Sequence, residues 1–297
     1  MGWLAVAPFG SSAEAASFVW SSWACQSADC TQVGSVTRYS NVIAAGDLAA
    51  TGNRNRDLLV TVVSLRGGAT VSQAPSYTTG ASYFEGQVML PNLASNASQV
   101  VFRLDFVTVG GTAADPIDVP VYLRSIDTDG NLSSITGGVT ERIEYMPPSV
   151  TVIAGSQLES ATAYDGGVAF RAKVCTTADA LIGCSAVGNY PTYSLATAPA
   201  SVAAEANYSA GVSSMTFAFG GEIPAAGSGG TAYLPRLFGM QGGILVAPNM
   251  TAAVTIAPTV AGPGSTVNGS LVCTNRGTSA ATSATCTASA LDSTGAS

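Results

Sequence analysis

Histidine is absent from this sequence of 297 residues, and Lys173 is its single lysine. Catalytic triads and base-assisted nucleophiles that rely on an imidazole are therefore excluded. Charged residues make up 10% of the chain, well below the usual share of about a quarter in soluble domains. No run of eighteen apolar residues occurs, which excludes a membrane-spanning helix.

Positive charge is also scarce, because the net charge is −7 and nearly every cationic side chain is arginine. Nucleic acids and anionic membranes are bound through basic patches, so we expect neither as a partner. No phosphate-binding loop or dinucleotide fingerprint is present either. These absences argue against an enzyme and leave structural and binding roles open.

The residues that are abundant favour strands and turns. Hydrophobic residues make up 47% of the chain, which is enough to build a sizeable core. Apolar and polar residues alternate over 100–106 and over 117–124, with a period of two that is typical of half-buried strands. Residues 58–65 are apolar on both faces and predict a central strand, whereas Pro120 predicts an edge strand or a bulge. Short helices are compatible with residues 12–18 and 177–181.

This pattern of many short strands separated by glycine-rich turns predicts an all-β fold, an antiparallel β-sandwich. The simplest division is one large domain over residues 17–246 and a smaller segment over 247–297. A split at Pro147 and Pro148 is the alternative. Residues 1–16 are compatible with either the remnant of a signal peptide or a first strand.

The six cysteines fall into three local pairs, and none has the two-residue spacing of a zinc knuckle. The pairs are Cys25/Cys30, Cys175/Cys184 and Cys273/Cys286. An even number of cysteines in local pairs predicts disulfides and an oxidising compartment, and reduced core cysteines are the alternative. The expected location is therefore extracellular or on the cell surface.

One polar motif could bind a metal ion. Asp127, Asp129 and Asn131 are spaced two residues apart around a glycine, and their side-chain oxygens are ligands that calcium prefers. Glu141 and Glu144 could complete the ligand set. The same residues also favour an ordinary turn. We expect no other cofactor and no catalytic residues.

Aromatic residues offer a second candidate site. Trp20, Trp23, Tyr83 and Phe84 could line a carbohydrate platform, although aromatics at such spacing belong more often to the core.

Four segments near the C-terminus carry a family resemblance. They are Ala247-Pro-Asn-Met-Thr, Pro263-Gly-Ser-Thr-Val267, Cys273-Thr-Asn-Arg-Gly277 and Ala280-Ala-Thr-Ser-Ala-Thr-Cys286. Together they resemble the immunoglobulin-like conserved repeat of bacterial cell-surface proteins, and they cover its front half. The resemblance implies an incomplete immunoglobulin-like sandwich on an exported protein, of the kind found in stalks, adhesins and fibre subunits. It carries no catalytic residues.

The same region suggests how the protein could assemble. Two short strands, one with Cys273 and one with Cys286, are expected around a turn at residues 275–277. A hairpin of this size cannot bury a core by itself, and its open edge could pair with a neighbouring chain. The sequence therefore predicts a self-assembling surface or filament subunit, a homo-oligomer. The alternatives are an adhesin-type module that recognises a glycan or a protein and, more remotely, a secreted hydrolase.

Overall fold

The computed structural model describes most of the chain. The described ranges are 4–6, 14–43, 55–91, 97–117, 120–131, 139–146, 150–208, 212–222, 234–246, 250–257, 268–275 and 288–290. Contacts between residues divide the chain into two compact units. One unit spans residues 17–244, and the other combines residues 1–16 with residues 245–297.

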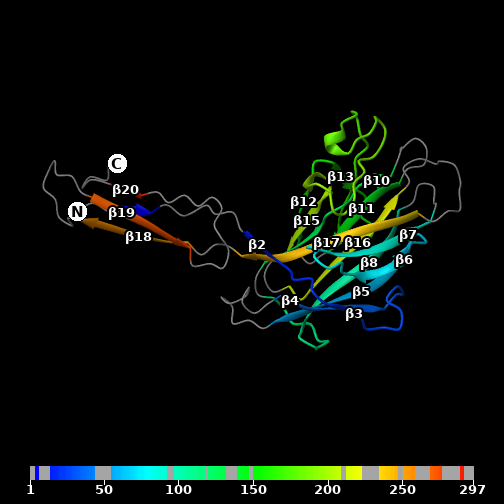
Figure 1. The fold of residues 1–297 in the computed structure, drawn as a ribbon, viewed down its shortest axis with the longest axis horizontal. Helices are drawn as coiled ribbons and strands as arrows, with labels where there is room; N and C mark the ends of the chain where they lie inside the picture. Colours follow the sequence, from blue (N-terminus) through cyan, green and yellow to red (C-terminus); the bar gives the residue numbers. More distant parts are fainter. Residues whose placement is uncertain are drawn as a thin grey trace. The chain divides into compact units, whose positions relative to one another are not determined.

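The larger unit contains two β-sheets, and each is described here by its strand order (Figure 1). Sheet I has the order β13-β14-β11-β16-β8-β5-β4-β3, with β10 added beside β11. Its strands are β3 (Trp23–Cys25), β4 (Val36–Ile43), β5 (Arg56–Arg66), β8 (Ser98–Thr108), β10 (Gly130–Asn131), β11 (Val139–Met146), β13 (Leu158–Ala161), β14 (Val168–Ala172) and β16 (Ser214–Glu222). All pairings within it are antiparallel.

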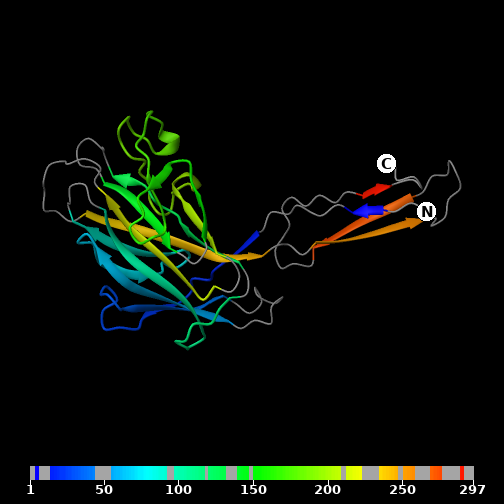
Figure 2. The same ribbon diagram turned by 180° about the vertical axis from the view of Figure 1, so that it is seen from behind.

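Sheet II has the order β12-β15-β9-β17-β7-β6 and is also antiparallel. Its strands are β6 (Thr70–Ser76), β7 (Phe84–Leu90), β9 (Val121–Ser125), β12 (Val150–Ala154), β15 (Ala204–Tyr208) and β17 (Leu234–Val246). Figure 2 shows the two sheets of this unit from behind. The predicted antiparallel β-sandwich is confirmed.

Aromatic rings fill the space between the sheets. Phe238 of sheet II lies 5.1 Å from Phe102 and 5.9 Å from Phe217, both of sheet I, between ring centroids. Phe84 of sheet II is also within 6.4 Å of Phe217. Since all four side chains are 1% exposed or less, they form the centre of the core. Burial of large aromatic surfaces is the main contribution that such a core makes to stability.

The prediction of a central strand over residues 58–65 is confirmed, and the predictions for Pro120 and for residues 12–18 are wrong. β5 lies between β4 and β8, as the apolar residues 58–65 predicted. β9 is an interior strand between β15 and β17, not an edge strand. Pro120 is compatible with this position because it precedes the first residue of β9 and removes no ladder hydrogen bond. Residues 14–17 form the strand β2 (Glu14–Ser17) instead of the short helix expected there.

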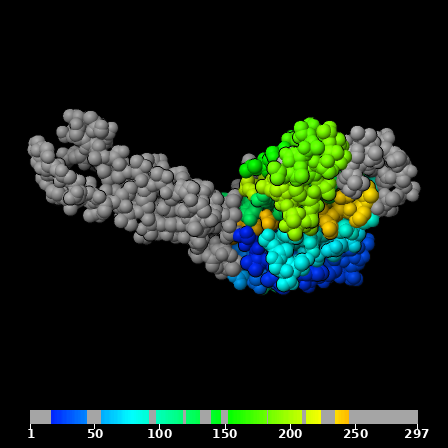
Figure 3. Space-filling view, turned by 45° about the horizontal axis from the view of Figure 1, so that its top comes forward, coloured from blue at the N-terminus to red at the C-terminus, as the bar shows by residue number. Residues whose placement is uncertain are grey.

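A long segment between β14 and β15 carries two short 3₁₀ turns, η2 (Ala180–Ile182) and η3 (Ala200–Val202). We call residues 173–203 the lobe. Its first part is closed by a disulfide between Cys175 and Cys184. In the space-filling view this green to yellow-green part of the chain forms one raised region of the surface (Figure 3).

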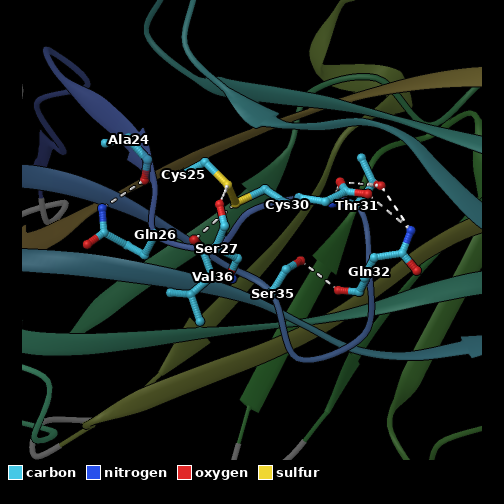
Figure 4. The surroundings of a disulfide bond; sticks show 10 residues. Ala24, Cys25, Gln26, Ser27, Cys30, Thr31, Gln32, Ser35 and Val36 are labelled. Carbon is cyan, nitrogen blue, oxygen red and sulfur yellow. Dashed lines mark hydrogen bonds between the residues drawn. A yellow bond between two sulfur atoms is a disulfide. The ribbon is translucent and has the colours of Figure 1, made fainter.

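A second disulfide joins Cys25, the last residue of β3, to Cys30 in the loop that follows (Figure 4). Hydrogen bonds close the same loop, since the Ser35 hydroxyl donates to the Gln32 carbonyl over 2.6 Å. The Val36 backbone N–H donates to the Ser27 hydroxyl. Both predicted local pairs within the larger unit are thus disulfides.

The smaller unit contains two described two-stranded sheets. β18 (Met250–Ala257) pairs with β19 (Asn268–Asn275), and β1 (Leu4–Val6) pairs with β20 (Ala288–Ala290). The pairing of β19 with β20 that the sequence suggested is not among the described pairs. Cys286 lies outside the described residues, so its disulfide with Cys273 stays a prediction. The assignment of residues 247–297 to an incomplete immunoglobulin-like repeat also stays a prediction.

None of the helical turns in the described ranges has the length and hydrophobicity that crossing a membrane would need.

Candidate functional site

The chain between β9 and β10 places two aspartates in the interior of the larger unit. The Ile126 N–H donates to the Gly239 carbonyl over 3.1 Å, and the Thr128 N–H donates to the Val202 carbonyl over 2.9 Å. These bonds hold residues 126–129 in an extended path. Since side chains alternate along such a path, Asp127 and Asp129 share one side. They are 6% and 4% exposed.

Glu141 of β11 completes a cluster of three carboxylates. Its backbone N–H donates to the Asp129 carbonyl over 2.8 Å, and the Asp129 N–H donates to Glu141 Oε2 over 3.2 Å. One carboxylate oxygen from each of Asp127, Asp129 and Glu141 lies within 4.8 Å of the other two. Glu141 is 3% exposed. We call these three residues the carboxylate cluster.

Partners of the cluster come from two other elements. Arg236 of β17 places Nη1 3.6 Å from Glu141 Oε1. The Tyr193 backbone N–H, in the lobe, donates to Asp129 Oδ2. Asp127 Oδ1 is buried and has no hydrogen-bond partner within the described part of the chain. One arginine therefore faces three buried carboxylates.

Burial raises the pKa of each acid in the cluster. The pKa of Asp127 rises to about 6, although Asp129 and Arg236 lower it. The pKa of Glu141 rises to about 8, through burial and then the charge of Asp127. The pKa of Asp129 rises to about 10, through burial and then the charges of Glu141 and Asp127. Like charges out of water disfavour one another, so the cluster either keeps protons or takes up another cation.

The cluster borders a pocket of about 550 Å³. Its other walls include Tyr83, Glu85 and Gln87 beside and within β7, together with residues 192–196 of the lobe and residues 235–237 of β17. The lining thus combines two tyrosines, carboxylates, an amide and hydroxyl groups. Concave sites with a few convergent polar groups and perturbed pKa values are typical binding sites.

Strand alternation explains how β7 contributes to this pocket. Phe84 and Val88 are fully buried, and Phe84 contacts the core from the inner face of sheet II. Glu85 and Gln87, on the alternate positions of the strand, therefore face away from sheet I. The pocket reaches from this outer face of sheet II to the buried carboxylate cluster.

Two glycines allow the close approaches that shape the pocket. A Cβ on Gly239 would lie 2.8 Å from Ile126 Cδ1 and 3.1 Å from Leu195 Cδ2. A Cβ on Gly130 would lie 2.3 Å from Tyr190 Cβ. The side chains of Leu195 and Tyr190 bring the lobe against sheet II and β10, and both contacts need a glycine opposite them.

The structure unites only part of the predicted calcium motif. Asp127, Asp129 and Glu141 come together, whereas Glu144 lies on the opposite face of β11 and is absent from the cluster. Residues 130–131 form β10, so the segment is not the ordinary turn that was the alternative. The side chain of Asn131 is outside what the structure describes. Gly130 serves close packing and not a tight turn.

Glu144 instead holds the loop between β13 and β14. Its Oε1 accepts from the backbone N–H groups of Asp165, at 2.8 Å, and Gly167, at 3.1 Å, while Oε2 accepts from the Tyr164 N–H at 3.0 Å. Arg142 Nη2 lies 3.5 Å from Glu144 Oε2, and both side chains are fully buried. This arrangement is a structural ion pair, separate from the pocket.

Sequence reasoning missed Arg236 and Tyr193, which are distant along the chain and carry no motif. Among the four aromatic candidates, Trp20 and Phe84 are core residues at 3% and 0% exposure, and Trp23 is 42% exposed. Tyr83 alone among them lines the pocket. In the sequence, only its position directly before the alternating strand β7 could have indicated that Tyr83 lines a site.

No protein-family model matches the sequence, and a search of curated proteins found no match. Among solved structures, the chain is similar to the "Adhesin domain of PrgB from Enterococcus faecalis bound to DNA", with 14% identity and a TM-score of 0.44 over 71% of this chain and 68% of that one. It is also similar to the N-terminal domain of the Streptococcus gordonii adhesin Sgo0707, with 8% identity and a TM-score of 0.39 over 86% of this chain and 61% of that one. Both are β-rich bacterial adhesin domains, and their likeness to this chain is remote.

Proposed function

We propose that residues 17–244 form the ligand-binding domain of an exported surface protein, an adhesin-type module. Its ligand would be rich in hydroxyl groups, as saccharides are. The observation that carries this proposal is the pocket of about 550 Å³, in which tyrosines and polar side chains converge beside buried carboxylates. Aromatic faces pack on the apolar side of a sugar ring, and polar side chains pair with its hydroxyls.

The protonation of the carboxylate cluster supports a ligand rich in hydroxyl groups. Burial raises the pKa of Asp129 to about 10 and that of Glu141 to about 8, so these two groups retain protons at neutral pH when no cation is bound. Protonated carboxyl groups both donate and accept hydrogen bonds, which suits hydroxyl groups. The lining carries charges of both signs, Arg236 beside Asp127 and Glu85, so an uncharged ligand rich in hydroxyl groups can pair with it throughout.

The two disulfides support export. Cys25–Cys30 and Cys175–Cys184 both close short loops on the larger unit. Disulfides of this structural kind persist in oxidising environments outside the cytosol. An extracellular or cell-surface location is therefore part of the proposal.

A glycan array probed with the purified monodisperse chain tests the proposal directly. We expect one class of saccharide to bind. Tyr83→Ala should weaken that binding at least about tenfold, because it removes a side chain that stacks on the sugar and hydrogen-bonds to it. Tyr77→Ala is the matched control, because Tyr77 lies in the same β6–β7 connection and does not line the pocket. Absence of any saccharide signal, or equal losses in both variants, would refute the pocket as a glycan site.

Three other predictions, on catalysis, nucleic-acid binding and self-assembly, can be tested with the same purified protein. Incubation of any bound saccharide with the protein, followed by product analysis, tests the expectation that the chain is not an enzyme. Arrays of nucleic acids test the prediction that the protein does not bind nucleic acid, and arrays of basic peptides serve for comparison. Negative-stain microscopy tests self-assembly, because ordered fibres would favour the filament subunit over a monomeric binding module.

A further inference from the structure

We propose that Asp127, Asp129 and Glu141 bind one hard divalent cation, with calcium as the preferred ion. This inference adds a metal site at the inner end of the pocket. It stands whether or not a saccharide binds in the outer part, because the cluster is built from the protein's own buried side chains.

The geometry of the three oxygens suits one shared ion. Each residue offers a carboxylate oxygen within 4.8 Å of the other two. Calcium binds oxygens at about 2.4 Å, so oxygens up to twice that distance apart can share one ion. The three residues come from two neighbouring segments that are hydrogen-bonded to each other through Asp129 and Glu141. The site is therefore assembled before any ion arrives.

A second observation points to a missing partner. Asp127 is 6% exposed, and its Oδ1 is buried without a hydrogen-bond partner among the described residues. A buried carboxylate oxygen that lacks a partner destabilises the folded protein, and more so when the group is charged. Because the same carboxylate belongs to the cluster, an ion held by all three residues would supply that partner.

The charge balance agrees with this geometry. Three carboxylates face one guanidinium, that of Arg236, whose Nη1 is 3.6 Å from Glu141 Oε1. Without a cation, the single positive charge of Arg236 faces three buried carboxylates that lie within 4.8 Å of one another. A divalent ion bound by these three residues would balance their charge more completely than Arg236 does.

The ligand set favours calcium over magnesium. Magnesium keeps several waters and uses one or two protein carboxylates, whereas calcium accepts six to eight oxygens in flexible geometry. Three carboxylates from the protein, with room in the adjoining pocket for water or ligand oxygens, match the second description. Softer metals are disfavoured because they prefer nitrogen and sulfur ligands.

Terbium luminescence and calorimetry on the full chain test the site. After chelation and buffer exchange, Tb³⁺ should luminesce on excitation of tyrosine, because Tyr83 and Tyr193 line the same pocket as the carboxylate cluster. Calcium should reverse this signal at lower concentrations than magnesium. Calcium at about a hundredfold above its Kd should raise the melting temperature by about 5–10 °C.

Three variants locate the ion. Asp127→Asn should weaken calcium binding at least about tenfold while leaving the chelated protein as stable as the parent or more so, since it removes a buried charge. Arg236→Gln should strengthen calcium binding, because it removes a positive charge beside the ion. Asp105→Asn is the matched control, an aspartate on β8 that pairs with Arg103 and lies outside the pocket. It should bind calcium as the parent does.

Each result decides the proposal. No terbium signal and no calcium heat in the parent protein would overturn it, and the cluster would then be a proton-sharing group. Unchanged binding in Asp127→Asn, or equal weakening in Asp105→Asn, would also overturn it, because the ion would then sit elsewhere. Terbium and calcium binding in a parent protein that binds no glycan would support the cation site while refuting the saccharide proposal, so the two can fail separately.

Discussion

Glu141 and Glu144 lie three residues apart on β11 and face opposite sides of sheet I. Glu141 meets Asp129 in the carboxylate cluster. Glu144 meets Arg142 and three backbone N–H groups of the loop between β13 and β14. The two glutamates look alike in the sequence, yet one borders a pocket and the other fixes a loop.

Glu144→Gln should therefore destabilise the fold without affecting the cluster. The change leaves the fully buried Arg142 with only the more distant carboxylate of Glu222, whose Oε2 is 3.9 Å from Arg142 Nη1, and it weakens the bonds to residues 164–167. The loss should be about 3–5 kcal/mol. Urea denaturation measures the loss. Glu159→Gln is the control, because Glu159 pairs with Arg171 at the surface with 41% of its side chain exposed. It should cost less than about 1 kcal/mol. Similar losses in the two variants would contradict the assigned role.

Asp57 should make the protein sensitive to acid. Burial alone would raise its pKa, but N–H bonds from Gly110 and Asn41, together with Arg38, hold the pKa below its ordinary value. Because the pKa of Asp57 is lower in the folded than in the unfolded protein, its ionised form stabilises the fold. This contribution is fully present above the unfolded-state pKa of about 3.9 and is lost as the pH falls through the folded-state pKa.

The measurement compares urea midpoints of the parent and Asp57→Asn between neutral pH and about pH 2. The variant should be less stable at neutral pH, and the difference should shrink as the pH falls. A constant difference over the whole range would show that Asp57 contributes by packing and not by charge.

Phe238 should be the most sensitive position of the aromatic core. Its ring lies within 6.2 Å of Phe84, Phe102, Phe217 and Phe219, measured between centroids. Phe238→Ala should cost about 3–5 kcal/mol, through lost burial and the cavity left behind. Leu237→Ala is the neighbouring control, since that side chain is 43% exposed. Thermal unfolding measures the loss of stability in both variants. An equal loss would contradict the burial of Phe238 and the exposure of Leu237 on neighbouring positions of β17.

The Cys175–Cys184 disulfide should stabilise the lobe that covers the pocket. Replacing both cysteines by serine reopens a loop with a sequence separation of 9 residues, which should cost about 2–3 kcal/mol. Hydrogen exchange should rise first in the lobe, because the Cys175 N–H bonds to the Asn189 carbonyl nearby. Exchange that rises evenly over both sheets would contradict a local role.

The sequence by itself determined the fold class. The alternation of apolar and polar residues in strands follows from the burial of one strand face, and glycine-rich segments mark the turns because glycine adopts turn conformations easily. The apolar residues 58–65 accordingly predicted the interior strand β5. Spacing within short loops also predicted Cys25–Cys30 and Cys175–Cys184, since neighbours along the chain need no tertiary contact to pair.

Only the tertiary structure decided which carboxylates meet. The alternation of β11 separates Glu144 from Glu141, although both were candidates for one ligand set. Arg236 and Tyr193 reach the cluster through strand order and lobe packing. Arg236 is 95 residues from Glu141 along the chain, and Tyr193 is 64 residues from Asp129. Local patterns specify the period of each element, whereas the contents of a buried site depend on which elements pack together.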